Sequence, residues 1–187
     1  MNTYDFDQTI FFPDSSYCFF MYCLRHYPRA VLHAVPASLL TGFRCLRKQA
    51  ETKELKEKLF SFLPYLEDVE ATVASFWEEH RDHLADWYLQ QKQPDDLILS
   101  ASLEFLLRPI CEELGVRLIA TPMNPYTGRI NGLNCHDEEK VRRFRLEYPG
   151  AETENFYSDS LSDLPMAQIA EHAFLVRNGL PQPWPDL

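Results

Sequence analysis

Asp5, Asp7 and Thr9 form an alternating pattern of acidic and hydroxyl side chains close to the start of the chain. Residues two apart in extended backbone point to the same face, so both carboxylates can reach one bound group. One carboxylate can attack an electrophile while the other gives and takes a proton, as nucleophilic and general acid–base catalysis require. The pattern alone would also fit a turn with solvated carboxylates, so its chemistry depends on which other residues gather there.

Further polar residues stand at the ends of expected strands or at the start of an expected helix. Ser100 follows a short apolar run, Asp159 and Asp163 follow another, and Lys140 lies in the first turn of a helix. The carboxyl ends of parallel strands meet at one edge of a sheet, and ligands bind there. We therefore expect four carboxylates, a hydroxyl and an ammonium in one crevice.

Four carboxylates in one crevice indicate a bound divalent metal. Neighbouring carboxylates repel one another, and each contact raises a pKa unless a cation lies between them. The residues offer oxygen donors, without a histidine or cysteine at ligand spacing, and Mg²⁺ prefers hard oxygen ligands. The sequence therefore predicts Mg²⁺ as the cofactor.

The elements that must position these residues alternate between short apolar runs and helical patterns. Strands are predicted over residues 2–4, 97–100, 116–121, 153–157 and 173–176. Helices are predicted over residues 103–114, 138–146 and 165–170. This order predicts an α/β fold with a mostly parallel, Rossmann-like sheet covered on both faces. The proline-rich tail over residues 181–187 is interpreted as an irregular terminus.

A long stretch with helical periodicity interrupts this alternation after the first strand. Its helices are expected over residues 17–24, 29–48 with a kink at Pro36, and 55–63 ending at Pro64, followed by one amphipathic helix from Val69 to Tyr88. We interpret residues 14–94 as a helical cap domain, and residues 1–13 and 95–187 as the catalytic core.

Several residues of this insertion could have roles beyond packing. His80 and His83 could bind a metal, but His80 lies on the apolar stripe and fits the bundle core better. Most aromatic side chains of the insertion are assigned to the core, and a minority could line a substrate pocket. The sequence singles out none of the remaining candidate substrate contacts, which are Ser15, Ser16, Arg25, Arg29 and Arg44.

The composition excludes several classes of function. The 187 residues include 18 Lys and Arg against 28 Asp and Glu, which gives a net charge of −10, and the pI is about 5.0. Proteins that bind a phosphate backbone need the opposite balance, so no nucleic-acid partner is expected. The five cysteines are odd in number and have no Cys-x-x-Cys spacing, so they are interpreted as reduced thiols.

Neither a secretion signal nor a membrane span is expected. Carboxylates occupy the first residues, where a signal peptide needs a cationic and then an apolar stretch. The longest weakly polar run, between Arg29 and Arg44, is shorter than the roughly 18 residues of a spanning helix. A cytoplasmic location without a membrane partner is the expectation.

Taken together and in order, the polar motifs resemble the four motifs of the haloacid dehalogenase superfamily. The helical insertion directly after the first motif resembles the cap of the phosphoserine-phosphatase-like branch, class IB. The resemblance covers the whole chain, and it implies the core fold and cap of that family. The motifs in chain order are Asp5-x-Asp7-x-Thr9, Ser100, Lys140 and Asp159-x-x-x-Asp163.

The resemblance implies a role for each acidic residue. Asp5 would be the nucleophile that forms an aspartyl-phosphate, and Asp7 would be the general acid and base. Mg²⁺ would be held by the Asp5 carboxylate, the Asp7 main-chain carbonyl and Asp159. Asp163 would bind the metal through water or orient its ligands.

The phosphate group would be bound by neighbouring polar groups in the same resemblance. These are the hydroxyl of Ser100, the ammonium of Lys140 and the backbone N–H groups of Phe6 and Ala101. Two positions next to the motifs differ from the family pattern. Ser158 stands where many members have glycine, and Leu103 stands where related chains often have proline.

The function that follows is a Mg²⁺-dependent phosphatase for the phosphomonoester of a small metabolite. Phosphorylated amino acids, amino alcohols or sugars are the substrate classes considered, and an aromatic wall could accept a cationic head group. A phosphotransferase that uses the same intermediate, or a binding or regulatory protein without turnover, are the alternatives. The sequence identifies neither the substrate nor the oligomeric state.

Overall fold

A six-stranded sheet forms the centre of the computed structural model, which describes residues 1–32 and 52–185. The strand order is β3-β2-β1-β6-β7-β8, and all neighbours are parallel except β7 and β8. The predicted α/β fold with a mostly parallel sheet is confirmed. The strands are β1 (Thr3–Tyr4), β2 (Leu97–Leu103), β3 (Arg117–Thr121), β6 (Thr153–Ser158), β7 (Ala170–Arg177) and β8 (Leu180–Pro183).

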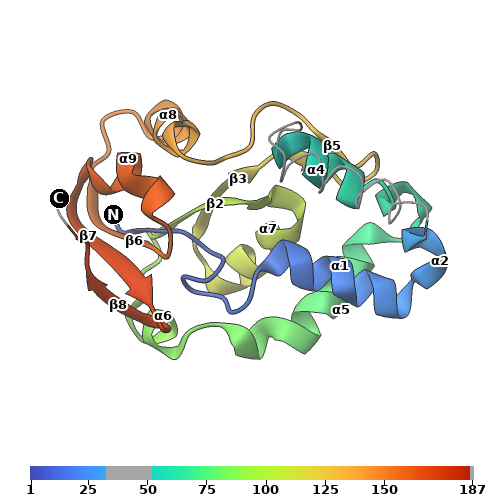
Figure 1. The fold of residues 1–187 in the computed structure, drawn as a ribbon. Coiled ribbons are helices and arrows are strands. Elements are labelled where there is room, and N and C mark those ends of the chain that lie inside the picture. Colours follow the sequence, from blue (N-terminus) through green and yellow to red (C-terminus); the bar gives the residue numbers. More distant parts are fainter. Residues whose placement is uncertain (33–51, 186–187) are drawn as a thin grey trace.

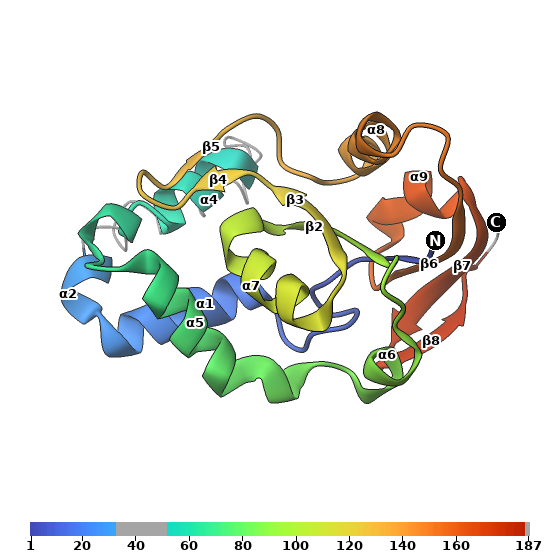
Figure 2. The ribbon, with the colours of Figure 1, turned by 180° about the vertical axis from the view of Figure 1, so that it is seen from behind.

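The helices separate into two groups in space (Figures 1 and 2). The first group, at the end away from the chain termini, is α1 (Ser15–His26), α2 (Pro28–Val31), α4 (Thr52–Leu59) and α5 (Val69–His80). The second group lies with the sheet and is α6 (Asp86–Gln91), α7 (Glu104–Leu114), α8 (Glu138–Glu147) and α9 (Leu164–Ala167). Three short 3-10 helices are η1 (Leu63–Tyr65), η2 (Arg81–His83) and η3 (Leu161–Asp163). The helix expected over residues 29–48 is described only at α2, and its kink at Pro36 lies outside the described residues.

The central strands β1 and β2 are buried on both faces, as in a parallel sheet between two helical layers. In β2, Ile98 belongs to one apolar cluster while its neighbours Leu97 and Leu99 belong to the other. The cluster around Ile98 includes side chains of α1, α5 and α7, whereas the opposite cluster includes Phe144 of α8 and Met166 of α9. The alternation of side chains along a strand therefore places helices on both faces.

The long amphipathic helix expected from Val69 to Tyr88 is wrong in its extent. Helix α5 ends at His80, and the chain then pairs with the loop after β1. The Ala85 N–H donates to the oxygen of Ile10 at 2.8 Å, and Leu84 forms an antiparallel bridge with Phe11. These main-chain bonds replace the helical bonds that the apolar stripe predicted. They hold residues 10–12, where the chain leaves the sheet, beside residues 83–85, where it returns.

The tail that was interpreted as irregular is also wrong in part, because residues 180–183 form β8. It pairs antiparallel with β7, with Pro181 opposite Val176 and Pro183 opposite Phe174. Proline has no N–H to donate, so it is tolerated on a strand at the sheet edge. The following Trp184 donates its N–H to the oxygen of Ala173 at 3.0 Å and is buried.

The segment around Gly128 forms a hairpin of β4 (Met123–Asn124) and β5 (Arg129–Ile130), which pair antiparallel. Gly128 has φ of 66°, and a Cβ there would lie 2.5 Å from the main-chain oxygen of Phe60. Glycine is therefore required at this position for two reasons, backbone conformation and close approach to the segment after α4.

We expect Gly128→Ala to lower the free energy of unfolding by about 2 kcal/mol or more, since positive φ and a backbone clash both act. Gly150→Ala is the matched control, because Gly150 has φ of 80° with open space around the added Cβ. Gly150→Ala should lower the free energy of unfolding by roughly 1 kcal/mol, since only the positive φ acts against the alanine. Urea unfolding of both variants measures the difference, and equal losses would contradict the proposed contact with Phe60.

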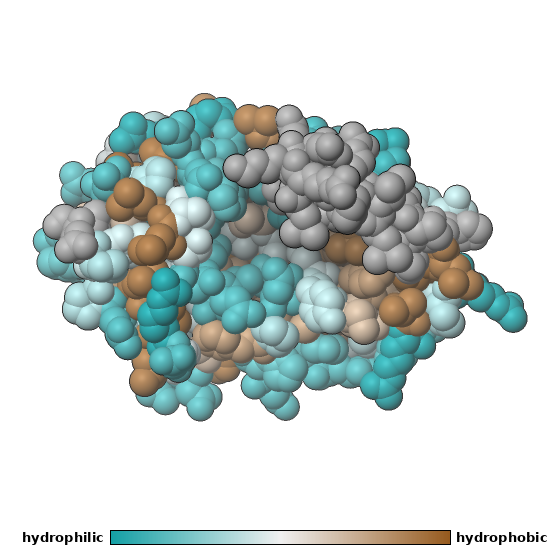
Figure 3. Space-filling view, viewed as in Figure 1, coloured by the Kyte–Doolittle hydropathy of each residue, from teal (hydrophilic) through white to brown (hydrophobic). Residues whose placement is uncertain are grey.

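The surface agrees with the acidic composition. The face seen in Figure 3 is mainly hydrophilic, and hydrophobic residues gather there only in small patches. None of the helices described in residues 1–32 and 52–185 has the length and apolar character needed to cross a bilayer.

Candidate active site

The site lies at the carboxyl end of β1, between β2 on one side and β6 on the other. The strand order reverses here, since β2 and β3 lie on one side of β1 and β6 and β7 on the other, and open α/β sheets bind ligands at such a point. Asp5 directly follows β1, and its N–H donates to the oxygen of Tyr157 in β6 at 2.8 Å. This bond holds the backbone of Asp5 in the sheet, and the residue is only 9% exposed.

Lys140 joins two of the carboxylates. Its Nζ lies 2.9 Å from Asp5 Oδ1 and 2.7 Å from Asp163 Oδ2. The residue is 1% exposed because it shares a face of α8 with Phe144, one turn later, and that face packs on the sheet. The structure thus buries a lysine that its acidic and basic sequence neighbours would have placed at the surface.

The charges in this cluster influence one another strongly. Burial lowers the pKa of the Lys140 ammonium, but Asp5 and Asp163 raise it by more, so it stays positively charged. Burial raises the pKa of the Asp5 carboxyl to about 7, against the opposing effect of Lys140. Asp163 Oδ2 also accepts a hydrogen bond from Ser158 Oγ at 2.6 Å, so Lys140 and Ser158 fix its orientation.

Asp7 is held by the start of α1 and by β2. Its Oδ1 accepts the backbone N–H of Ser15 at 2.7 Å, and its Oδ2 accepts a short hydrogen bond from Ser102 Oγ. Burial raises the pKa of the Asp7 carboxyl to about 6, and these hydrogen bonds act in the opposite direction. A carboxyl group that titrates near neutral pH can both give and take a proton, which suits a general acid and base.

Ser100 and Ser102 lie on the same face of β2. Ser100 Oγ accepts the N–H of Ser102 at 3.0 Å, and Ser102 Oγ lies 3.2 Å from Ser15 Oγ and 3.0 Å from Ser16 Oγ. Ser15 and Ser16 were candidate substrate contacts, and both are buried against Ser102. Their contacts link them to the serine that holds Asp7.

Asp159 completes the group of acidic residues. Its N–H donates to Thr9 Oγ1 at 2.9 Å, and its carbonyl oxygen accepts a bond from Arg177 at 2.8 Å. Burial and then Asp163 raise the pKa of its carboxyl. Asp159 and Arg177 line a pocket of about 530 Å³ together with Gln8, and Asp159 is partly exposed.

The residues present fit a hard cation. Within residues 1–32 and 52–185, no three His, Cys, Asp or Glu side chains form a ready metal cluster. The predicted set, however, needs only the carboxylates of Asp5 and Asp159 and one main-chain oxygen. Burial and then the neighbouring Asp163 carboxylate raise the pKa of both carboxyls, and a bound cation would favour their charged forms. All of the donors are oxygens, which matches Mg²⁺.

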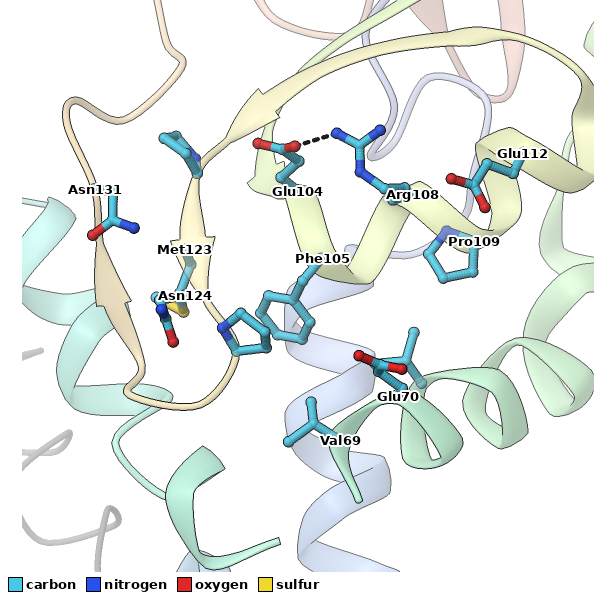
Figure 4. A pocket seen from close by; sticks show the side chains of 13 residues that line it. Val69, Glu70, Glu104, Phe105, Arg108, Pro109, Glu112, Met123, Asn124 and Asn131 are labelled. Carbon is cyan, nitrogen blue, oxygen red and sulfur yellow. Dashed lines mark hydrogen bonds and ion pairs between the residues drawn. The ribbon is translucent and has the colours of Figure 1, made fainter. Parts of the chain in front are cut away.

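A different and larger cavity lies apart from this cluster (Figure 4). It has a volume of about 650 Å³ between α5, α7 and β4, and Phe105 lies on its wall. None of the acidic residues discussed above lines it. A buried catalytic group need not line a large cavity, so the assignment of the site rests on Asp5 and Lys140 and not on volume.

Sequence reasoning missed three residues of this site. Ser102 lies two residues after Ser100, a spacing that indicates a shared face, but the sequence does not predict its contact with Asp7. Thr9 belongs to the first motif, but the sequence does not predict its bond to Asp159. Lys56 of α4 donates to the main-chain oxygen of Ala101 at 2.6 Å, a contact that the sequence does not predict, because a lysine in a charged amphipathic helix usually faces solvent.

The interpretation of His80 as a core residue agrees with the structure. Its Nδ1 lies 2.8 Å from the oxygen of Phe76, and the two rings stack with centroids 4.3 Å apart. His83 lies near Phe11, with ring centroids 5.9 Å apart. His80 is therefore partly buried against its own helix, α5, whereas His83 is exposed beside Phe11.

Comparison with known proteins gives one family and several similar folds. The family model of the haloacid dehalogenase-like hydrolases matches residues 3–168. No match was found among curated proteins.

Solved structures share the architecture. A protein of unknown function from Bordetella pertussis Tohama I is 25% identical with a TM-score of 0.75, over 94% of this chain and 88% of that one. A phosphoserine phosphohydrolase-like protein from Francisella tularensis is 13% identical with a TM-score of 0.60, over 96% and 89%. A probable phosphoserine phosphatase from Vibrio cholerae is 13% identical with a TM-score of 0.64, over 92% and 55%. The last two similarities concern the fold alone.

Proposed function

We propose a phosphatase activity from the premise that this chain belongs to the haloacid dehalogenase-like hydrolase family, whose model covers residues 3–168. The substrate is the phosphomonoester of a small metabolite. The observation that carries the proposal is the buried contact of Lys140 with Asp5, beside an Asp7 carboxyl that titrates near neutral pH. This arrangement supplies a nucleophile, a cation and a proton donor at one sheet edge.

In the first step, an oxygen of the Asp5 carboxylate attacks phosphorus. A phosphorus–oxygen bond to Asp5 forms, and the bond to the alcohol oxygen breaks. The protonated Asp7 carboxyl gives its proton to that oxygen, so a neutral alcohol leaves. Ser102 and Ser15 hold Asp7 in the orientation that this transfer needs.

In the second step, a water molecule attacks the phosphorus of the aspartyl-phosphate. The Asp7 carboxylate takes a proton from this water as its oxygen bonds to phosphorus. The bond to Asp5 breaks, which releases inorganic phosphate and restores both carboxyl groups to their starting states. A carboxyl with a pKa of about 6 can act in both directions near neutral pH.

The phosphoryl oxygens are bound by groups around Asp5. The Lys140 ammonium and the Ser100 hydroxyl are the side-chain donors, and the N–H groups of Phe6 and Ala101 are the main-chain donors that we assign. Fixed donors of this kind stabilise the charge that develops in the transition state.

Asp5, Asp159 and the main-chain carbonyl of Asp7 are the groups that would hold Mg²⁺. When bound, the ion neutralises phosphoryl charge and polarises the phosphorus–oxygen bonds. Asp163 orients its neighbours and is not assigned as a direct ligand, because Lys140 and Ser158 both bind its Oδ2.

The test is a phosphate-release assay over a panel of metabolite phosphates and one aryl phosphate. Activity is expected with millimolar Mg²⁺, to be lost when a chelator removes the ion and to return when Mg²⁺ is added in excess. An untreated sample carried through the same buffer exchange is the control. Turnover that is indifferent to the chelator would overturn the metal assignment, and an inactive panel would overturn the phosphatase proposal.

Ser102→Ala tests whether this serine positions the general acid. Alkyl alcohols are poor leaving groups that need protonation, whereas aryl alcohols leave readily without it. We expect kcat/KM for an alkyl phosphate to fall by about 10²-fold and for an aryl phosphate by only a few fold. Ser61→Ala, at a partly exposed serine that donates to the oxygen of Lys58, is the control. Equal losses on both esters would show that Ser102 does not act through Asp7.

A further inference from the structure

Strand β2 carries a bulge at its carboxyl end. Its partners on β3 are Ile119 for Leu99 and Thr121 for Leu103, so β2 advances four residues where β3 advances two. The residues in excess lie within 100–102, the segment that holds two of the phosphoryl donors assigned above. Bulges often occur beside active sites, where they change the direction of a side chain.

Side chains bond the main-chain groups of this bulge. A bulge breaks the ladder of main-chain hydrogen bonds, so its buried polar groups need other partners. The carbonyl oxygen of Ala101 accepts hydrogen bonds from Thr121 Oγ1 and from Lys56 Nζ, both at 2.6 Å. The N–H of Ser102, in the same peptide group, donates to Ser100 Oγ at 3.0 Å. This peptide group is therefore fixed at its oxygen and at its nitrogen.

Thr121 is itself held in one orientation. The residue is fully buried, and its Oγ1 accepts the N–H of Cys135 at 3.0 Å. A hydroxyl group has a single proton to donate. The oxygen of Ala101 at 2.6 Å is nearer than Asn134 Oδ1 at 3.1 Å, and Asn134 Oδ1 already accepts a bond from Lys56 Nζ. We therefore assign the proton of Thr121 to Ala101.

The bulge leaves the hydroxyl proton of Ser100 available. Ser100 is 1% exposed, and its Oγ accepts the N–H of Ser102. Within residues 1–32 and 52–185, no acceptor takes the proton of this hydroxyl. A buried hydroxyl that accepts from the main chain and keeps its proton is a fixed donor for a phosphoryl oxygen.

We propose that Thr121 is a positioning residue of the phosphoryl-binding site. Its hydroxyl holds the bulge of β2 in the shape that fixes Ser100 Oγ as a donor. This inference rests on the proposed phosphatase function, in which Ser100 binds a phosphoryl oxygen. Thr121 lies in β3, outside the four motifs, and acts on the substrate only through the bulge.

Thr121→Val tests the proposal, because valine keeps the shape of threonine and removes its hydroxyl. We expect kcat/KM for an aryl phosphate to fall about 5- to 10-fold, the value of one hydrogen bond between neutral groups. The affinity for inorganic phosphate, measured by isothermal titration calorimetry with millimolar Mg²⁺, should fall by a similar factor. Thr121→Ser keeps a hydroxyl and should stay within about twofold of the wild type in both measurements.

A double-mutant cycle with Ser100→Ala shows whether Thr121 acts through this serine. Ser100→Ala alone should lower kcat/KM and phosphate affinity about 10- to 100-fold, because it removes a hydrogen bond to a charged group. Adding Thr121→Val to Ser100→Ala should then change either quantity less than about twofold, since the hydroxyl that Thr121 positions is already absent. Equal losses from Thr121→Val in both backgrounds would overturn the proposal.

Thr153→Val is the matched control. Thr153 is also buried, and its hydroxyl lies 3.2 Å from that of Thr3, but it is the first residue of β6, at the opposite end of the strands. It should leave kcat/KM and phosphate affinity within about twofold, and urea unfolding shows how much stability each valine variant loses.

The phosphate titrations separate this inference from the proposed function. Lack of turnover of every ester by the wild type would overturn the phosphatase proposal, and the titrations alone would then decide the role of Thr121. A wild type that does not bind phosphate, or a loss of affinity in Thr153→Val equal to that in Thr121→Val, would overturn the assignment of Thr121.

Discussion

Asp5→Asn is expected to abolish phosphate release, with a loss of at least about 10³-fold in kcat. An amide oxygen cannot form the acyl phosphate in place of a carboxylate, and the remaining groups have no other nucleophile to activate. Lys140 still finds an oxygen acceptor in the variant, so the fold should persist. The assay is turnover of an aryl phosphate with Mg²⁺, with circular dichroism as the check on folding.

Asp96→Asn is the matched control for this substitution. Asp96 is also fully buried, but it lies before β2, at the opposite end of the strands, where it accepts hydrogen bonds from Asn2 and Gln93. Its variant should keep wild-type kcat within a few fold. Acid-quenched wild type should also carry a phosphoryl group on the peptide that contains Asp5. Full turnover by Asp5→Asn, or a label on another residue, would contradict its role as nucleophile.

Lys140→Met is expected to remove activity and to destabilise the protein by about 3–5 kcal/mol. The lysine is the shared partner of Asp5 and Asp163, and removing one member of a buried ion pair leaves uncompensated charge. Natural domains are stable by only about 5–15 kcal/mol, so this is a large fraction of the total. Urea unfolding monitored by circular dichroism measures the change.

The double variant Lys140→Met/Asp163→Asn sharpens this prediction. Neutralising Asp163 removes one of the two carboxylates that the lysine compensated, so the double variant should be more stable than the single one. Lys92→Met is the control. Lys92 donates a hydrogen bond to the main-chain oxygen of Leu114, which is neutral, so removing this lysine breaks a bond to an uncharged acceptor. It should cost about 1 kcal/mol or less. A loss below 1 kcal/mol for Lys140→Met would show that the cluster does not depend on its charge.

The sequence predicted the local elements of the core well. Apolar runs such as Leu97–Leu99 identify buried strands because a parallel sheet buries both faces. Gly115 ends α7 with φ of 70°, as a glycine after a helical stripe predicts. The motif residues Asp5, Asp7 and Asp159 could be named because each follows a strand, and their roles came from the family resemblance.

Other features followed from contacts that no local pattern encodes. The stripe from Val69 to Tyr88 continues past His80, yet main-chain bonds between residues 83–85 and the loop after β1 end the helix. The proline-rich sequence of β8 indicates an irregular tail, but in the structure this segment pairs with the edge of β7. The boundary of the cap at residues 14–94 stays a prediction.

The sequence by itself predicted which acidic, hydroxyl and basic residues end a strand or begin a helix, since side-chain chemistry and strand periodicity are local properties. Only the tertiary structure decided that Lys140 is buried between Asp5 and Asp163, that Ser102 holds Asp7, and that a lysine of α4 reaches the same sheet edge. These pairings join segments up to 135 residues apart. Their partners are chosen by the packing of helices on the sheet, which no spacing along the chain specifies.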